Sequence, residues 1–176
     1  MTEKPPVAHM IYGYLGSGKT SYAKKLERET GAIRFSPDEW MTQLFGDDPE
    51  ESTFAERSSK VEKLMENLWV QLLAKGIDIV LDSGFWSRSS RDRAREKIES
   101  LRAVPRLYFI KTSEDTMWKR CESRNQNLNG SLYIAKNTFE VLKSRFEPLG
   151  RDEPFILIEK EAEPVSPYNS GQSLRD

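Results

Sequence analysis

One continuous stretch, Gly13-Tyr14-Leu15-Gly16-Ser17-Gly18-Lys19-Thr20, constrains this chain more than any other because it follows the pattern G-x-x-x-x-G-K-T. Glycines let a backbone adopt conformations that a side chain would block, so such a loop wraps closely around a phosphate with its N–H groups pointing inward. In this pattern the lysine places a cation on the outer phosphates, and the threonine hydroxyl is a ligand for Mg²⁺. The sequence therefore predicts that ATP and Mg²⁺ bind along the loop as far as Ser21.

The segments on either side of the loop are those that the pattern requires. Val7–Tyr12 is a short apolar run that predicts a buried strand, and Ser21–Glu27 predicts a helix. A helix beginning at about Gly18 adds the positive end of its dipole to the phosphate site. A glycine-rich turn with an incidental lysine is the competing interpretation, and the order strand, loop, helix favours phosphate binding over it.

Length and composition set the limits for the rest of the chain. With 176 residues, of which 37% are hydrophobic and 31% charged, the sequence predicts one polar, soluble domain with a proper core. Cys121 is the sole cysteine, which excludes a disulfide framework and a cysteine zinc site. No apolar run is long enough to cross a bilayer and no signal-peptide core is present, so a cytoplasmic location is the default expectation. A net charge of −1 gives no general attraction to nucleic acid or to anionic membranes.

Apolar strands alternate with helical patterns after the loop. The expected strands are 32–35, 77–82, 104–110 and 154–159, and helices are expected from 36, over 52–75, 87–101 and 114–124, and over 136–146. This alternation predicts an α/β domain in which helices cover both faces of a parallel sheet. We expect the domain to span residues 1–160, and residues 161–176, which lack periodicity, to form an irregular tail.

Two acidic residues follow predicted strands, at the end of the sheet where ligands of parallel sheets bind. Asp82 ends an apolar strand and is a candidate Mg²⁺ ligand, directly or through water, together with Thr20. Asp38 is a candidate general base that would accept a proton from an acceptor hydroxyl. The competing interpretations are a turn aspartate for Asp82 and ordinary helix capping for Asp38, which stands in the helix-opening run Ser36-Pro37-Asp38-Glu39.

Arginines gather on the helix after Asp82 and at the end of the helix over 114–124. Arg88 and Arg91 lie nearest the predicted cleft and are candidates to bind an acidic group of a substrate, the competing interpretation being a solvated, ion-paired helix face. Arg124, favoured over Arg120 because it adjoins an asparagine-rich segment, is a candidate to neutralise charge on the γ-phosphate. A cation that stabilises the helix C-terminus is the alternative for Arg124. Four aromatic residues are candidate walls of an acceptor site: Trp40, Phe45, Phe85 and Trp86.

Taken together, these residues resemble the small P-loop kinases of the AAA_33 type, near the polynucleotide kinase, zeta-toxin and chloramphenicol phosphotransferase group. Besides the loop, the matching pieces are Ser36-Pro37-Asp38, Leu81–Arg88 with Arg91-Asp92, Arg124-Asn125 and Arg145-Phe146-Glu147-Pro148. The resemblance implies a P-loop NTPase three-layer α/β/α sandwich, with a five-stranded parallel sheet of order 2-3-1-4-5 and a helical lid at about 125–146. It also implies that Asp38 matches a general base and Arg124 a lid arginine.

The residues and the resemblance together predict an ATP-dependent kinase that phosphorylates a small-molecule hydroxyl, with Lys19, Asp38 and Arg124 as catalytic residues. A polynucleotide 5′-hydroxyl kinase is an alternative, although residues 126–129 lack the further arginine that such kinases carry. An NTP-binding regulatory ATPase without an acceptor is another alternative. A nucleotide kinase that uses Arg88 and Arg91 for a second phosphate is the weakest of the four hypotheses.

Overall fold

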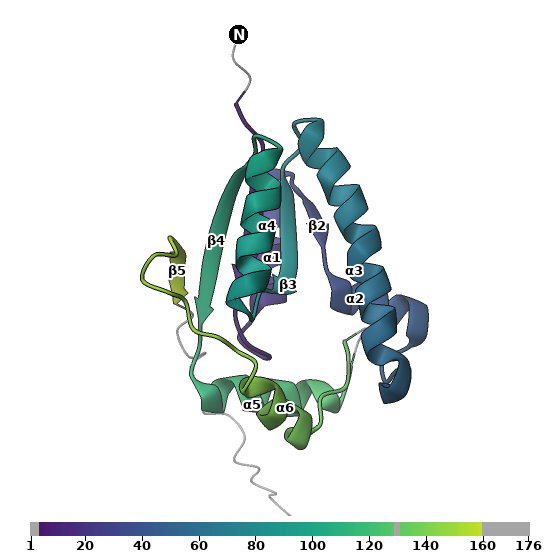
Figure 1. The fold of residues 1–176 in the computed structure, drawn as a ribbon. Coiled ribbons are helices and arrows are strands. Elements are labelled where there is room, and N and C mark those ends of the chain that lie inside the picture. Colours follow the sequence, from purple (N-terminus) through teal and green to yellow (C-terminus); the bar gives the residue numbers. More distant parts are fainter. Residues whose placement is uncertain (1–3, 129–130, 160–176) are drawn as a thin grey trace, which may run out of the picture.

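Five parallel strands form the centre of the molecule in the computed structural model, which describes residues 4–128 and 131–159. The strands are β1 (Val7–Tyr12), β2 (Ile33–Phe35), β3 (Ile79–Gly84), β4 (Val104–Lys111) and β5 (Ile156–Glu159). They are arranged in the order β2-β3-β1-β4-β5, and every neighbouring pair is parallel (Figure 1). The predicted fold class and strand order are confirmed, whereas the tail predicted at 161–176 lies outside the described residues.

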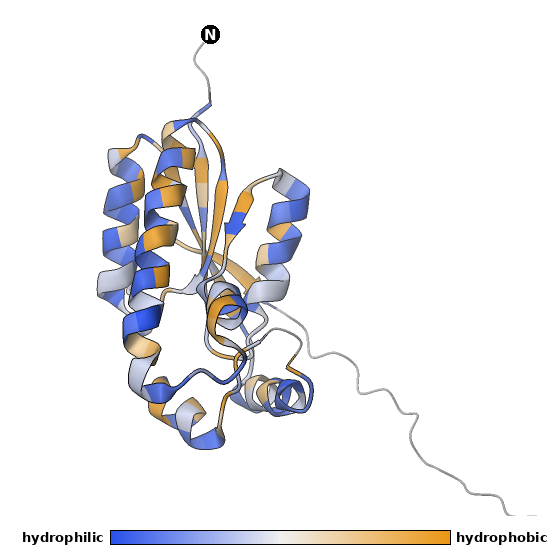
Figure 2. Cartoon of the chain, turned by 90° about the vertical axis from the view of Figure 1, so that its right-hand side faces the viewer, coloured by the Kyte–Doolittle hydropathy of each residue, from blue (hydrophilic) through white to orange (hydrophobic). Residues whose placement is uncertain are grey.

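Helices cover both faces of the sheet. The described helices are α1 (Lys19–Thr30), α2 (Pro37–Phe45), α3 (Glu51–Ala74), α4 (Arg88–Ser100), α5 (Glu114–Asn125) and α6 (Lys136–Lys143). Because side chains alternate along a strand, Met10 packs in one core with residues of α2, α3 and α4, and Ile11 packs in the other with residues of α1. Figure 2 shows the hydrophobic strands between helices whose outer surfaces are largely hydrophilic.

The carboxyl ends of the strands are covered by α5 and α6 (Figure 1). A third apolar cluster joins these helices to the glycine-rich loop and consists of Tyr14, Leu15, Cys121, Ile134 and Phe139. The Tyr14 hydroxyl donates a hydrogen bond to the Phe139 carbonyl, and the Asn125 side chain bonds to the backbone of Ile134 at 2.6 and 3.1 Å. The segment predicted as a lid therefore packs against the loop in this structure. No described helix combines the length and the apolar character needed to span a membrane.

Two local predictions were wrong. Helix α6 ends at Lys143 and not at Phe146. The capping suggested by the helix-opening run Ser36-Pro37-Asp38-Glu39 is absent at Ser36, whose side chain makes no capping hydrogen bond to α2. The Glu39 carboxylate instead pairs with Arg34 at 2.7 Å and with Lys24 at 3.0 Å. Two cations hold that carboxylate more strongly than one backbone N–H. At the start of α2, Ser36 and Pro37 are buried and Asp38 is exposed.

Candidate functional site

The glycine-rich loop is held in place from two sides. The indole Nε1 of Trp86, which follows β3, donates to the Gly13 carbonyl at 3.1 Å. The Thr112 hydroxyl, which follows β4, donates to the Ser17 carbonyl at 3.0 Å. The loop backbone is thus fixed by the residues that follow its two neighbouring strands, as the sheet order β3-β1-β4 allows.

Gly16 is a position at which this loop requires glycine. Its φ is +74°, and a Cβ built there would lie 2.1 Å from the Met117 carbonyl oxygen in α5. Gly31 has nearly the same φ, +72°, with nothing within 4 Å of such a Cβ. The two positions share the backbone strain of a left-handed residue and differ in the contact that alanine would make.

We expect Gly16→Ala to destabilise the protein more than Gly31→Ala. Strain alone costs about 1–2 kcal/mol at either position. The clash with α5 adds about 1–3 kcal/mol at Gly16, because backbone atoms must move. Urea unfolding of both variants measures the difference, and equal losses of stability would show that the loop and α5 are not packed as described.

Lys19 extends from the start of α1 over the loop. Its ammonium group donates to the Tyr14 carbonyl at 2.9 Å. Burial lowers the pKa of Lys19, while the carboxylates of Asp82 and Asp38 act in the opposite direction and Arg124 lowers it further. The candidate residues from four separate segments of the sequence therefore lie close enough to act on one another.

These residues surround one cavity, called here the loop cavity. Its volume is about 190 Å³. The wall includes Leu15, Gly16, Gly18, Lys19, Thr20, Ser21, Asp38, Arg120, Arg124, Ser131, Leu132 and Ile134. The loop, the N-termini of α1 and α2, the end of α5 and the segment before α6 thus converge on this cavity. Arg120, ranked below Arg124 by sequence, lines the same cavity.

Asp82 lies in β3 beside this cavity, with a side chain that is 2% exposed. Neither of its carboxylate oxygens has a hydrogen-bond partner among the described residues, and Arg34 Nη1 lies 3.8 Å from Oδ2. Burial raises the pKa of Asp82 to about 6, while Lys19 and the nearby Thr20 hydroxyl, which forms no hydrogen bond of ordinary geometry to it, lower the pKa. A buried carboxylate without donors next to a threonine hydroxyl fits a divalent cation, because Mg²⁺ takes oxygen ligands.

Arg34 is a residue that the sequence reasoning missed. It lies in β2, and its guanidinium reaches Glu27 of α1 at 3.1 Å, Glu39 of α2 at 2.7 Å and Asp82 of β3 at 3.8 Å. Arg34 thereby ties the start of α2, which carries Asp38, to the strand that carries Asp82. The sequence could have indicated Arg34, because it stands between Ile33 and Phe35 in a predicted strand. A charged side chain in a strand covered by helices needs partners of opposite charge.

Arg124 faces the loop cavity from the last turn of α5. Its Nε is buried without a hydrogen-bond partner among the described residues. A buried guanidinium nitrogen that lacks a partner is costly. An anion in the loop cavity would supply the missing acceptor.

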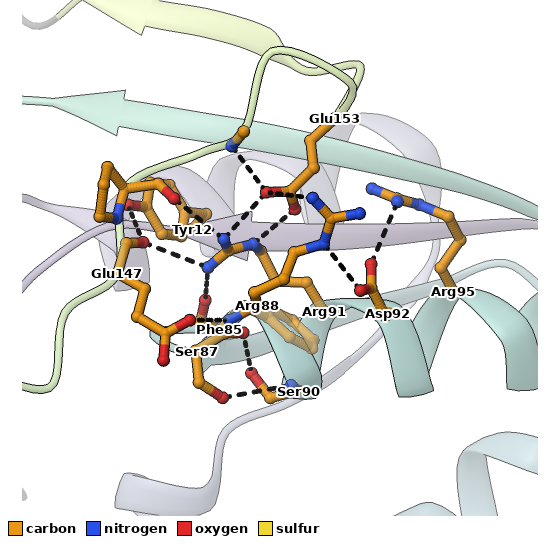
Figure 3. A network of polar contacts seen from close by, with 12 residues as sticks. Tyr12, Phe85, Ser87, Arg88, Ser90, Arg91, Asp92, Arg95, Glu147 and Glu153 are labelled. Carbon is orange, nitrogen blue, oxygen red and sulfur yellow. Dashed lines mark hydrogen bonds and ion pairs between the residues drawn. The ribbon is translucent and has the colours of Figure 1, made fainter.

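Arg91 does not fit the role in substrate binding that the sequence predicted for it. Its side chain is fully buried, and Figure 3 shows its guanidinium between Glu153 and the carbonyl of Phe85. It donates to both Glu153 oxygens, at 2.6 and 2.9 Å, and to the backbone carbonyls of Phe85, Trp86, Glu147 and Pro148. All of its N–H groups are thus used to join α4 to the residues after β3 and to the segment before β5.

Arg88 lies on the same face of α4 as Arg91 and is also held by ion pairs within the protein. It forms a two-pronged pair with Asp152 at 2.8 and 3.0 Å and a further bond to Asp92 at 2.7 Å. Neither Arg88 nor Arg91 lines either cavity described here. Helical spacing correctly put the two arginines on one face, but that face packs against residues 147–153.

A second, larger cavity of about 360 Å³, called here the side cavity, lies between α3, α4 and the ends of β2 and β3. Its wall contains Phe35, Pro37, Glu62, Met65, Glu66, Trp69, Leu81, Ser83, Phe85, Trp86, Ser87, Ser90, Arg93, Ala94, Lys97 and Arg145. Phe85 and Trp86 line this cavity, whereas Trp40 and Phe45, the other two aromatic candidates, do not.

Comparison with known proteins agrees with this geometry. A family model described as an AAA domain, AAA_33, matches residues 9–149. A search of curated proteins found no match. Among solved structures, a protein of Chloroflexus aurantiacus proposed to be a kinase has a TM-score of 0.71 at 17% identity and covers 89% of each chain.

Two further structures share the fold. Kti12 of Chaetomium thermophilum, solved with ADP-AlF3, has a TM-score of 0.65 at 15% identity over 89% of this chain and 91% of its own. A gluconokinase of Sinorhizobium meliloti has a TM-score of 0.60 at 16% identity over 89% of this chain and 84% of its own. At identities this low, the structural similarity establishes the fold alone, which is that of the P-loop kinases.

Proposed function

Because this chain belongs to the AAA_33 family of AAA domains, we propose that it is an ATP-dependent phosphotransferase that moves the γ-phosphate of ATP to a hydroxyl group of a small molecule. The observation that carries the proposal is the meeting of Lys19, Asp38 and Arg124 in the wall of one cavity beside the buried Asp82. The fold shared with a gluconokinase and with an ADP-AlF3 complex supports it.

The donor half of the reaction belongs to the loop cavity. Its backbone N–H groups and the N-terminus of α1 would bind the phosphates of ATP, and Lys19 would exchange its bond to the Tyr14 carbonyl for an outer phosphate oxygen. Thr20 and Asp82 would hold Mg²⁺, which when bound offsets charge on the phosphates. The described residues contain no group of three or more acidic, histidine or cysteine side chains placed to hold a metal, so phosphate and water oxygens would complete the coordination.

The acceptor half depends on Asp38 at the start of α2. Its carboxylate would take the proton of the acceptor hydroxyl as that oxygen forms a bond to the γ-phosphorus. The bond from the γ-phosphorus to the bridging oxygen then breaks and leaves ADP. Arg124 and Lys19 would neutralise charge on the phosphoryl group during transfer, and the segment over 125–146 would keep water from competing.

A labelled-acceptor screen tests this function. The protein is incubated with ATP labelled in the γ-phosphate, Mg²⁺ and a panel of small hydroxyl compounds, and organic products are separated from free phosphate. We expect at least one labelled phosphate ester that disappears when EDTA replaces Mg²⁺. A panel covering sugars, sugar acids, amino alcohols and aromatic alcohols that yields no labelled ester would contradict the proposal.

A further inference from the structure

The side cavity has an apolar and aromatic interior. Phe35 ends β2, Leu81 lies within β3, Met65 and Trp69 come from α3, and Phe85 follows β3. These side chains also belong to the main core cluster, so packing on their far sides fixes their positions. A rigid apolar wall of this kind favours a flat or apolar ligand body.

This cavity adjoins the group that would accept the proton. Pro37 lines the side cavity, and its neighbour Asp38 lines the loop cavity, so the two cavities meet at the first turn of α2. Glu62 of the side cavity is close enough to Asp38 for the aspartate to raise the pKa of Glu62, in addition to the larger effect of packing around the glutamate. A molecule in the side cavity would therefore have Asp38 at its edge.

Two of the three cations that line the side cavity have no ion-pair partner among the described residues, unlike Arg88 and Arg91, which the sequence favoured. The side chains of Arg93 and Arg145 make no hydrogen bond or ion pair with any described residue, although Arg93 acts electrostatically on the nearby Glu62. Lys97 is paired with Glu66 at 3.4 Å. The lining carries three cations and two carboxylates, so one positive charge is left in excess. An uncompensated cation at an apolar cavity favours an anionic ligand.

We propose that the side cavity binds the phosphoryl acceptor, and that the acceptor is a compact hydroxyl compound with a flat or apolar body and one anionic group that pairs with Arg93 and Arg145. The inference rests on the proposed phosphotransfer and adds to it the class of substrate. The cavity volume of about 360 Å³ lies at the lower end of the range for small-molecule sites, which excludes a polymer within the cavity.

Intrinsic fluorescence tests this inference without knowledge of the natural acceptor, because Trp69 and Trp86 line the side cavity. AMP-PNP and Mg²⁺ are kept saturating so that the loop cavity is filled. Three probes are titrated: para-(hydroxymethyl)benzoate, its uncharged methyl ester and para-(hydroxymethyl)phenyl phosphate. The variants are Arg93→Gln and Arg145→Gln, and the matched control is Arg95→Gln, which lies on the same helix, pairs with Asp92 at 3.6 Å and does not line the cavity.

We expect the carboxylate probe to bind about tenfold more tightly than its ester, since charge-assisted hydrogen bonds are the strong ones. Each cavity variant should weaken the carboxylate about tenfold and leave the ester unchanged, and Arg95→Gln should behave like the wild type. A higher affinity for the phosphate probe than for the carboxylate probe would identify the acceptor as a phosphorylated compound. A higher affinity for the carboxylate probe would identify it as a carboxylic acid.

Equal affinities for acid and ester, an anion preference that survives both cavity variants, or no binding of any probe would overturn the inference. A separate titration with AMP-PNP alone tests the nucleotide site of the proposed function. A protein that binds no AMP-PNP would contradict the nucleotide site, while the tryptophans would still report whether Arg93 and Arg145 select an anion.

Discussion

Replacing Asp38 with asparagine is expected to lower kcat for phosphate transfer by about 10²–10⁴-fold, the usual contribution of a general base. Asparagine keeps the size of the side chain and can accept a hydrogen bond from the acceptor hydroxyl. It cannot take the proton, so the hydroxyl oxygen stays a poor nucleophile. The affinity for AMP-PNP should change little, because the loop and Lys19 hold the phosphates.

The position of Asp38 supports this assignment. Its carboxylate acts electrostatically on Lys19, on Asp82 and on Glu62 of the side cavity. Asp38 thus lies in the wall of the loop cavity with Lys19 and, next to Pro37, at the edge of the side cavity.

Steady-state kinetics with the best acceptor of the labelled screen measure this effect, and an AMP-PNP titration checks the nucleotide site. The control is Asp48→Asn, an exposed aspartate in the turn after α2 that lines neither cavity. We expect the control to match the wild type. If Asp38→Asn retained a kcat close to that of Asp48→Asn, proton transfer to Asp38 would have no part in the reaction.

Removing the Arg91 side chain is expected to be the most destabilising single change in the fold. In Arg91→Met the buried Glu153 loses its closest cation and keeps only the more distant Arg88, at 3.6 Å. Breaking a buried pair in this way costs about 3–5 kcal/mol. For a chain of this size the melting temperature should fall by about 6–20 °C. The four backbone carbonyls that Arg91 binds would also lose their donor.

Thermal and urea unfolding of two further variants give the comparison. Arg95→Met breaks a 3.6 Å pair on the same helix, which is expected to cost no more than about 1 kcal/mol. The double variant Arg91→Met with Glu153→Leu removes both charges and should recover part of the stability, because no buried carboxylate is then left without its main cation. A loss in Arg91→Met as small as that in Arg95→Met would mean that this pair does not hold α4 to the segment before β5.

The pH dependence of stability follows from the same pair. Burial by itself raises the pKa of Glu153, but hydrogen bonds from Arg91 and from the Gly150 N–H hold it below the ordinary value. A depressed pKa means that the unfolded chain takes up the proton first, so this stabilisation is complete above about pH 4.5 and is lost as the pH falls further. The double variant should lose less stability than the wild type over that acidic range.

Much of the fold and of the nucleotide site could be predicted because the signals are local. The glycine-rich loop is one uninterrupted stretch, and its close fit against α5 requires glycine at position 16. Asp38 and Asp82 were found by a rule of topology, since parallel strands end at the same edge of a sheet and the following residues must meet there.

The acceptor side could not be predicted in the same way. Arg91 and Arg93 are separated by about 200° around a helix, so a small error in the assumed orientation of α4 exchanges a buried structural arginine for one that lines a cavity. Glu62 of α3 and Arg145 after α6 join the side cavity from distant parts of the sequence. Their meeting depends on how the helices pack, which no short pattern encodes.

The central claim is that the γ-phosphate of ATP is transferred from the loop cavity to a hydroxyl compound rather than to water. A single-turnover reaction with γ-labelled ATP, Mg²⁺, excess wild-type protein and the best acceptor measures it directly, through the partition of label between phosphate ester and free phosphate. We expect most of the label in the ester, and more free phosphate when the acceptor is left out. Label that appears as free phosphate alone, at a rate that no acceptor changes, would contradict the claim and identify a nucleotide-hydrolysing switch instead.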